Sequence, residues 1–209
     1  MSAAIDILFE DEHILAVNKP PWVLSVPGRG PEKQDSMATR CQAYCGEIHV
    51  VHRLDCATSG VMIFAKTKVA EKLLHQQFRE RETQKVYIAV GAGKACLEQG
   101  QVQLPLITDW PNRPKQKVDR ESGKHSITEY QLIEQRADRA RMKLYPITGR
   151  SHQLRVHMLY LGLPIIGDRL YAPDKIASAS DRMLLHAERL VLHHPLSEDT
   201  LTLESPCPF

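Results

Sequence analysis

Asp55 is the side chain in this sequence whose type and surroundings most suggest chemistry. It lies in the run His52-Arg53-Leu54-Asp55-Cys56-Ala57-Thr58-Ser59-Gly60, which leads directly into the apolar run 61–65. A carboxylate two residues from an arginine can serve as a nucleophile or as a base. The same residue types also favour an ordinary turn, because their side chains bond the local backbone and Gly accepts positive φ. Taken alone, the run leaves both interpretations open.

The elements that must position Asp55 follow from periodicity, with helices and strands interspersed but not regularly alternating. Strands are expected at 5–9, 13–18, 61–65, 85–91 and 101–107, helices at 37–45, 68–81 and 152–161, and hairpins at 127–135 with 139–146 and 183–194 with 200–204. This pattern favours an α+β fold, a mixed and largely antiparallel sheet with flanking helices, formed by a single domain over 1–209.

Two further side chains stand out within these elements. Tyr87 points away from the face that Val86 and Ile88 share in the expected strand, and a tyrosine there usually packs in the core. Arg155 falls in the first turn of the expected helix 152–161, where the helix dipole favours acidic residues. Its position therefore indicates a purpose other than helix stability.

The chain is nearly neutral, with a formal net charge of +2, but its basic residues are concentrated in two segments. Segment 113–120 carries Arg113, Lys115, Lys117 and Arg120 against Asp119, and segment 139–155 carries Arg139, Arg141, Lys143, Arg150 and Arg155 with no acidic residue. Such segments indicate an anion-binding surface, although charge runs are more often merely solvated.

Composition places the chain among soluble proteins of the cytoplasm. Hydrophobic residues make up 43% and charged residues 25%, a globular balance, and no stretch approaches the ~20 apolar residues of a membrane span. The first six residues lack a basic start followed by an apolar run, as an export leader would have. Five cysteines are expected as reduced thiols, and Cys41 and Cys45 lack a second pair that would complete a metal site.

Three stretches together resemble the RluA family of pseudouridine synthases: the run 52–60, Lys85-Val86-Tyr87-Ile88-Ala89-Val90, and Gly149-Arg150-Ser151-His152-Gln153-Leu154-Arg155-Val156-His157. Similarity at 17–20, 167–169 and 184–187 extends the resemblance over nearly the whole chain. The short length and segment 104–118 are most similar to a member that acts on large-subunit rRNA and on tRNA anticodon stem-loops. Many relatives carry an N-terminal S4 RNA-binding domain, and no S4 domain is expected before Ile5.

The resemblance implies an isomerase that detaches uracil from C1′ of a uridine and rejoins it through C5, without cofactor or metal. Asp55 matches the essential aspartate of the family, which would attack C1′, add to C6 or remove a C2′ proton. Tyr87 matches the active-site tyrosine of the family. The resemblance therefore replaces the interpretation of Tyr87 as a core residue. Arg155 matches the arginine that pairs with the aspartate, and such a pair would hold Asp55 ionised. The family fold implies that these residues line a central active-site cleft.

A uridine inside folded RNA must leave its stack to react, so base flipping is expected. Arg53 is the candidate to occupy the vacated space. The remaining expected RNA contacts are Arg113, Lys115, Lys117, Arg150 and His152. The expected partner is therefore RNA, either tRNA or rRNA, with no membrane and with the protein acting as a monomer.

Two rival functions are weaker. A catalytically silent RNA-binding or assembly factor of the same fold would be indicated by the loss of Asp55, Tyr87 or Arg155, and all three are present. A metal-dependent hydrolase would need ligands from His152, His157, His186, His193 and His194. Helical ligands favour a spacing of three or four, and adjacent residues of a strand face opposite ways. The histidine spacing therefore argues against a metal site.

Overall fold

The computed structural model describes residues 5–197 and 199–209. The chain forms two compact units: unit 1 comprises Met1–Lys85 and Ala187–Pro208, and unit 2 comprises Val86–His186 together with Phe209. Residues 1–4, on which the expectation of no leader partly rests, and Glu198 of the expected final turn lie outside the described residues. No helix in the described part of the chain is long and apolar enough to cross a membrane.

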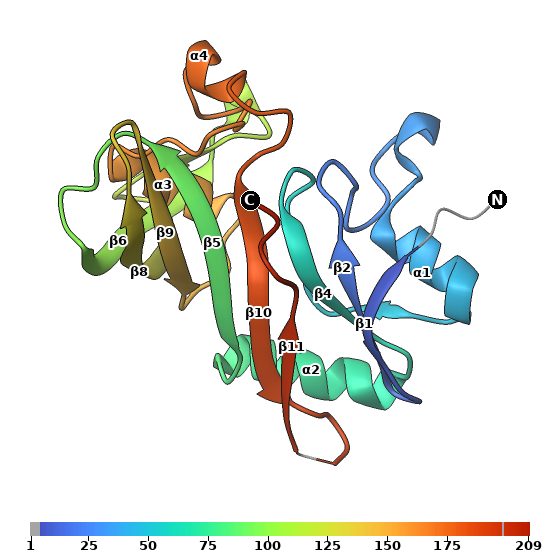
Figure 1. The fold of residues 1–209 in the computed structure, drawn as a ribbon. Coiled ribbons are helices and arrows are strands. Elements are labelled where there is room, and N and C mark those ends of the chain that lie inside the picture. Colours follow the sequence, from blue (N-terminus) through green and yellow to red (C-terminus); the bar gives the residue numbers. More distant parts are fainter. Residues whose placement is uncertain (1–4, 198) are drawn as a thin grey trace. The chain divides into compact units, whose positions relative to one another are not determined.

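Unit 1 is built on strands in the order β1-β2-β4-β10 (Figure 1). β3 pairs with β4 and β11 with β10, and these two pairs, β1–β2 and β2–β4 are all antiparallel. The helices α1 and α2 and the 3-10 turn η1 belong to the same unit. The bounds are β1 Asp6–Glu10, β2 Ile14–Lys19, η1 Pro31–Lys33, α1 Met37–Cys45, β3 His49–Val50, β4 Ser59–Ala65, α2 Lys68–Glu80, β10 Leu185–His193 and β11 Thr200–Glu204.

The core of unit 1 forms where β2, β4, β10 and β11 bury apolar side chains against α2. Every residue of β4 is buried, as expected of a strand covered on both faces. The buried cluster includes Ile14, Ala16, Val61, Ile63, Leu74, Leu190, Leu192 and Leu203. On α2 the buried face carries Ala70, Leu74 and Gln77, whereas Val69 is 57% exposed.

Unit 2 holds a second run of antiparallel strands in the order β5-β9-β8-β6-β7. The bounds are β5 Gln84–Ala92, β6 Gln99–Thr108, η2 Trp110–Asn112, β7 Gln116–Val118, β8 Lys124–Gln135, β9 Arg139–Pro146, α3 Gln153–Tyr160 and α4 Asp174–Ala177. The antiparallel strand pairs and the flanking helices of both units confirm the predicted α+β class. The short β3, β7 and α4 were not anticipated from periodicity.

Two element ends differ from the sequence expectation because of backbone conformation. β4 begins at Ser59 and not at Val61, so Gly60 lies within the strand with φ of 112°. A Cβ at Gly60 would lie 2.2 Å from the carbonyl oxygen of Ala187, and only glycine fits. α3 begins at Gln153 because His152 adopts a left-handed conformation with φ of 54°.

A buried hydrogen-bond network fixes α3 against β8. The Ser126 hydroxyl donates to the Leu104 carbonyl, so its oxygen accepts from Nε2–H of His157 at 2.9 Å. His157 Nδ1 then accepts from the Thr128 hydroxyl at 2.8 Å, and Gln153 Nε2 donates to Thr128 Oγ1 at 3.0 Å. This network assigns the Nε2–H tautomer to a neutral His157. Burial lowers the pKa of His157 to about 4.

The lowered pKa of His157 predicts a loss of stability on acidification. The unfolded chain binds a proton near pH 6.5 that the folded chain does not, so stability falls as pH drops from 6.5 towards 4. His157→Gln removes this titration and keeps one donor and one acceptor. Between pH 7 and pH 5 its free energy of unfolding should fall by about 2 kcal/mol less than that of the wild type. Urea unfolding at several pH values measures this.

His75→Gln is the control, because His75 is exposed on α2 and lies outside this network. Its pH dependence should follow the wild type. A pH dependence of His157→Gln equal to that of the wild type would mean that His157 titrates alike in the folded and unfolded chains.

Candidate active site

Asp55 lies in the loop between β3 and β4, and hydrogen bonds hold the backbone on both sides of it. Leu54 N–H donates to Ser25 Oγ at 3.0 Å, and the Ser25 hydroxyl donates to the Leu54 carbonyl at 2.6 Å. Thr58 N–H donates to the Asp55 carbonyl at 3.1 Å, which closes a turn. Ser25 is buried, so these bonds form away from competing water.

Lys19 is fully buried and holds the other side of the same loop. Its ammonium donates to the carbonyls of Pro20 (2.9 Å), Val23 (2.6 Å) and Cys56 (3.0 Å). A buried ammonium is stable only when its donors are paired, and three carbonyl contacts meet that requirement. This role of Lys19 was not expected from the sequence. The only local hint of it is that a lysine stands at the end of a largely apolar strand.

His52 supports the loop from its first residue as a neutral imidazole. Its Nε2 accepts from Ile63 N–H at 3.0 Å, and its ring stacks on Phe78 with centroids 4.9 Å apart. Desolvation, reinforced by the positive charge of Lys85, lowers the pKa of His52 to about 3. The ring therefore stays an acceptor at neutral pH and keeps its bond to β4.

Within this held loop the polar and apolar residues separate. Val51, Leu54 and Ala57 are buried at intervals of three, while Asp55 is half-buried and Arg53 is exposed. The loop therefore uses its apolar residues as anchors and leaves the carboxylate and the arginine accessible. This arrangement is more specific than the ordinary turn that the sequence alone allowed.

Arg155 is buried on α3 and forms a bidentate ion pair with Asp168. Its Nε lies 2.8 Å from Asp168 Oδ2, and its Nη2 lies 2.6 Å from Asp168 Oδ1. The family resemblance implies only the pairing of Arg155 with Asp55, and no role was expected for Asp168. A fork-to-fork pair fixes the plane of a guanidinium as well as its position. Arg155 is therefore held in one orientation inside unit 2.

The segment around Asp168 is shaped for this pair. Oδ1 of Asp168 also accepts from the backbone N–H of Leu170 at 2.9 Å and of Tyr171 at 3.3 Å. Gly167 has φ of 81°, and a Cβ there would lie 2.0 Å from the Arg182 carbonyl oxygen. Only glycine can precede Asp168 in this conformation.

Tyr171 connects α3 to the basic loop between β6 and β7. Its ring lies 5.0 Å from the Arg155 guanidinium carbon, and its hydroxyl lies 2.7 Å from His152 Nδ1. Gln116 N–H donates to the same hydroxyl at 2.7 Å. One side chain therefore contacts the start of α3, Arg155 and β7.

Tyr87 lies on β5 opposite Leu144 of β9. It is half-buried, whereas Val86 and Ile88 on either side are buried. As expected from the period of a strand, Tyr87 lies on the opposite face from Val86 and Ile88, and it is more exposed than either of them. A tyrosine at that level of exposure can present its ring to a ligand.

The expected RNA contacts divide between the units. Arg53, like Asp55, belongs to unit 1, and Arg113, Lys115, Lys117, Arg150 and His152 belong to unit 2, like Tyr87 and Arg155. Lys117, Arg113 and Arg150 are exposed, and Arg150 also donates to the His125 carbonyl at 3.1 Å. His152 is half-buried, and its Nδ1 contacts the Tyr171 hydroxyl.

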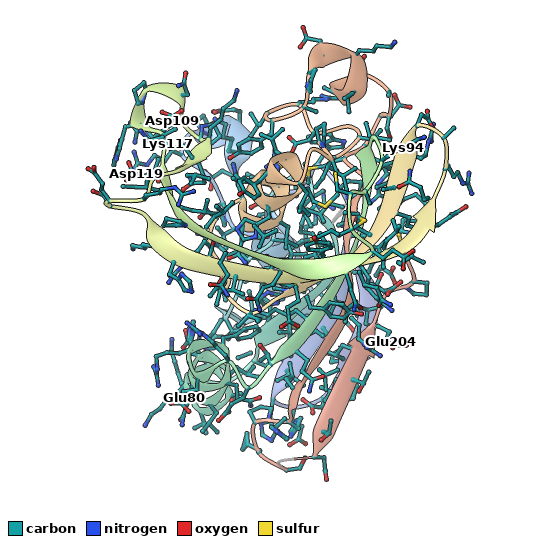
Figure 2. The ribbon with its side chains drawn as sticks, turned by 90° about the vertical axis from the view of Figure 1, so that its left-hand side faces the viewer. Glu80, Lys94, Asp109, Lys117, Asp119 and Glu204 are labelled. Atoms are coloured by element: carbon teal, nitrogen blue, oxygen red, sulfur yellow. The ribbon has the colours of Figure 1, made fainter. Side chains whose placement is uncertain are left out.

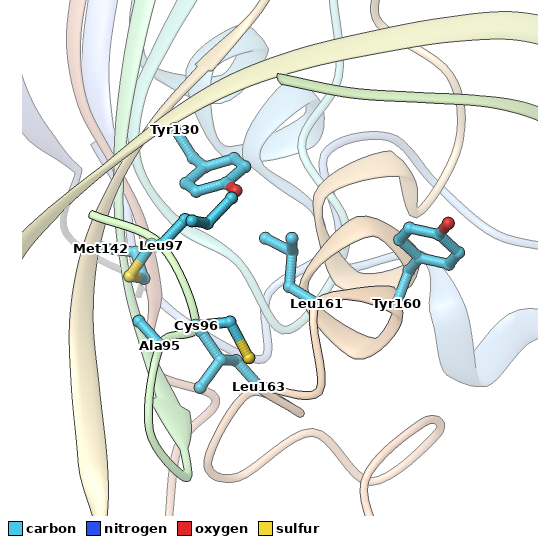
Figure 3. Close-up of a pocket in the computed structure, with 8 residues that line it drawn as sticks. All are labelled: Ala95, Cys96, Leu97, Tyr130, Met142, Tyr160, Leu161 and Leu163. Atoms are coloured by element: carbon cyan, nitrogen blue, oxygen red, sulfur yellow. The ribbon is translucent and has the colours of Figure 1, made fainter. Parts of the chain in front are cut away.

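A pocket of about 220 Å³ lies elsewhere in unit 2 (Figure 3). It is lined by Ala95, Cys96, Leu97, Tyr130, Met142, Tyr160, Leu161 and Leu163. None of the predicted site residues lines it, and its wall has no carboxylate. Among the residues that the structure describes, no group of His, Cys, Asp and Glu could hold a metal ion, and none of the five cysteines is paired in a disulfide.

Comparison with known proteins identifies the family. A family model described as RNA pseudouridylate synthase matches residues 13–160. The dual-specificity RNA pseudouridine synthase RluA of Escherichia coli K12 is 54% identical over 204 residues, which is 97% of this chain and 93% of that protein. The protein of the same name from Vibrio cholerae is 52% identical over 205 residues, 98% of this chain and 84% of that protein.

Solved structures agree with the sequence comparison. The structure of human RNA pseudouridylate synthase domain containing 1 matches with a TM-score of 0.84 and 25% identity, over 99% of this chain and 84% of that chain. Human RNA pseudouridylate synthase domain containing 4 matches with a TM-score of 0.76 and 27% identity, over 97% of this chain and 88% of that chain. This chain therefore belongs to the RluA family of RNA pseudouridine synthases, which are isomerases.

Proposed function

We propose that this protein converts uridine to pseudouridine in both large-subunit rRNA and tRNA anticodon stem-loops. The observation that carries the proposal is the identity of 54%, over 97% of the chain, to a relative named as a dual-specificity RNA pseudouridine synthase. The held carboxylate loop and the buried, oriented arginine support the same activity. The reaction only moves the attachment of uracil on the ribose from N1 to C5, so it needs no oxidant or reductant.

Asp55 is the reacting carboxylate in this proposal. It attacks C1′, adds to C6, or removes a C2′ proton to give a glycal, and each of these routes requires the ionised form. The bonds of Leu54 and Cys56 to Ser25 and Lys19 fix the backbone on either side of Asp55. A fixed backbone lowers the entropy that the side chain must lose to reach the reacting atom.

Arg155 and Tyr87 complete the catalytic set. Asp168 binds Nε and Nη2 of Arg155 and so orients the guanidinium, which in this proposal serves as the cationic partner of the reacting carboxylate. A positive charge within a few ångströms favours the charged form of a carboxylate, which is the form that all three routes require. The ring of Tyr87 lies against the target uracil, and its hydroxyl assists proton movement.

The target base must be extruded before it can react. Arg53 is exposed beside the Asp55 loop and fills the space that the base leaves. The exposed Arg113, Lys117 and Arg150, with the half-buried Lys115, contact phosphates and position the RNA without reading its sequence.

Asp55→Asn should abolish pseudouridine formation, with turnover at least about 10³-fold lower, because an amide is neither a nucleophile nor a base. Affinity for RNA should stay within about tenfold, since binding rests mainly on phosphate contacts. Tritium release from 5-tritiated uridine measures the first and filter binding the second. The exposed Asp199→Asn is the control and should behave as the wild type. Turnover by Asp55→Asn would disprove the role, and a wild type that binds RNA without turnover would favour the silent factor.

Tyr87→Ala should lower turnover by about 10²-fold or more, because the ring that contacts the uracil is lost. The melting temperature should fall by only a few degrees, since Tyr87 is half-buried. Tyr130→Ala is the matched control, because Tyr130 is only 7% exposed and its loss should mainly lower stability. Global unfolding of Tyr87→Ala with normal turnover per folded molecule would restore the core interpretation.

Replacing Lys115 and Lys117 together by Gln should flatten the salt dependence of RNA binding. Each lost phosphate contact reduces the slope of log K against log salt concentration by about 0.7 to 0.9. The double variant Lys33→Gln, Lys72→Gln removes two exposed charges from unit 1 and serves as the control. A slope equal to that of the wild type would remove the segment from the RNA-binding surface.

A further inference from the structure

Trp110 is exposed to an unusual degree for its type. It forms the first residue of η2, between β6 and β7, and is 66% exposed. Tryptophan is normally among the most buried side chains on average, because its large apolar surface is costly to leave in water. The exposure therefore calls for an explanation, and neither the expected site nor its chemistry supplies one.

One face of the Trp110 ring already carries a cation. The guanidinium carbon of Arg113 lies 4.3 Å from the centroid of the indole ring. Although Arg113 lies over one face of the ring, Trp110 keeps 66% of its surface exposed. The pair therefore presents a flat aromatic surface to solvent with a positive charge behind it.

The loop that carries Trp110 is held in place by several hydrogen bonds. Asp109 N–H donates to the Lys115 carbonyl at 2.9 Å, and Lys115 N–H donates to the Asn112 carbonyl at 3.0 Å. Asn112 Nδ2 donates to Asp109 Oδ2 at 2.9 Å. The bond from Gln116 N–H to Tyr171 then ties the loop to the segment beside α3. A ligand on Trp110 therefore meets a surface that needs little ordering.

The surroundings of Trp110 are polar and mainly basic. Arg113, Lys115, Lys117 and Arg120 lie within ten residues of Trp110, against Asp109 and Asp119. Asp109, Lys117 and Asp119 lie close together on this part of unit 2 (Figure 2). The buried core of a protein-binding patch is depleted in charged residues, lysine among them. An aromatic ring among basic residues is instead the pattern of sites that stack single-stranded bases.

We propose that Trp110, backed by Arg113, is a stacking platform for one unpaired nucleobase of the RNA substrate, distinct from the uridine that reacts. The proposal rests on the proposed function for its substrate and goes beyond it by naming a second base-binding site. Unpaired loop bases expose the π-face that a tryptophan needs, whereas bases in a duplex do not. The platform therefore selects single-stranded context and does not read a particular base.

Fluorescence of a single-tryptophan protein tests the contact directly. The chain has two tryptophans, so Trp22→Phe leaves Trp110 as the only one. A tRNA anticodon stem-loop should change its emission, and a fully paired RNA duplex of equal length should not. Equal changes with both RNAs, or no change with either, would overturn the platform.

Binding measurements test its contribution. Trp110→Ala should weaken affinity for the stem-loop about tenfold and leave duplex affinity unchanged, and Trp110→Phe should restore most of the loss. Leu97→Ala is the matched control, because Leu97 is 65% exposed in the same unit but lies outside the basic loop. Unchanged stem-loop affinity in Trp110→Ala, or an equal loss for the duplex, would contradict the proposal.

Failure of the platform and failure of the proposed function give different results. A wild type that forms pseudouridine, with Trp110→Ala binding stem-loops normally, overturns only the platform. A wild type that forms no pseudouridine but loses stem-loop affinity in Trp110→Ala overturns the isomerase and leaves the platform supported as an RNA-binding site.

Discussion

The hold on the backbone around Asp55 is the constraint on which the proposed chemistry depends. Lys19 and Ser25 come from a segment far from Asp55 in sequence, and they bond the residues directly after and before it. Burying an ammonium costs free energy unless its donors are paired, so the loop carbonyl of Cys56 is also part of what stabilises Lys19. The requirement is mutual: the lysine needs the loop in one conformation, and the loop needs the lysine.

A similar device orients Arg155. Asp168 binds one edge of the guanidinium through two hydrogen bonds. The backbone N–H groups of Leu170 and Tyr171 in turn donate to the carboxylate of Asp168. The hydroxyl of Tyr171 accepts a hydrogen bond from the backbone N–H of Gln116, at the end of the basic loop. The segment 168–171 therefore sets both the orientation of a predicted catalytic residue and the placement of a predicted RNA-binding loop, which explains why residues that touch no substrate can matter to the reaction.

Local signals in the sequence predicted most elements, because caps and periodicity act within a few residues. α1 begins at a capping box on Ser36 and ends at Gly46, a glycine with positive φ, and both signals are local in the sequence. The partners of Lys19 and Arg155 could not be predicted from local patterns. A hydrogen bond from a lysine to a carbonyl 37 residues away, for example, leaves no periodic or short-range signal in the sequence. Gly60 was interpreted as a turn residue because a positive φ inside a buried strand is rare. The catalytic roles proposed for Asp55, Tyr87 and Arg155 come from the family resemblance. Neither periodicity nor composition could have indicated them.

The arrangement also bears on the silent RNA-binding alternative. Binding to phosphates needs exposed cations, which tolerate considerable freedom because the attraction depends weakly on orientation. A factor with that function alone gains nothing from a carboxylate loop held by a fully buried lysine, or from a guanidinium fixed by a bidentate pair. Chemistry on a single uridine does require such precision, because misplacement by about 1 Å can reduce a rate 10²-fold. The rigid parts of the molecule therefore favour the isomerase over a factor that only binds.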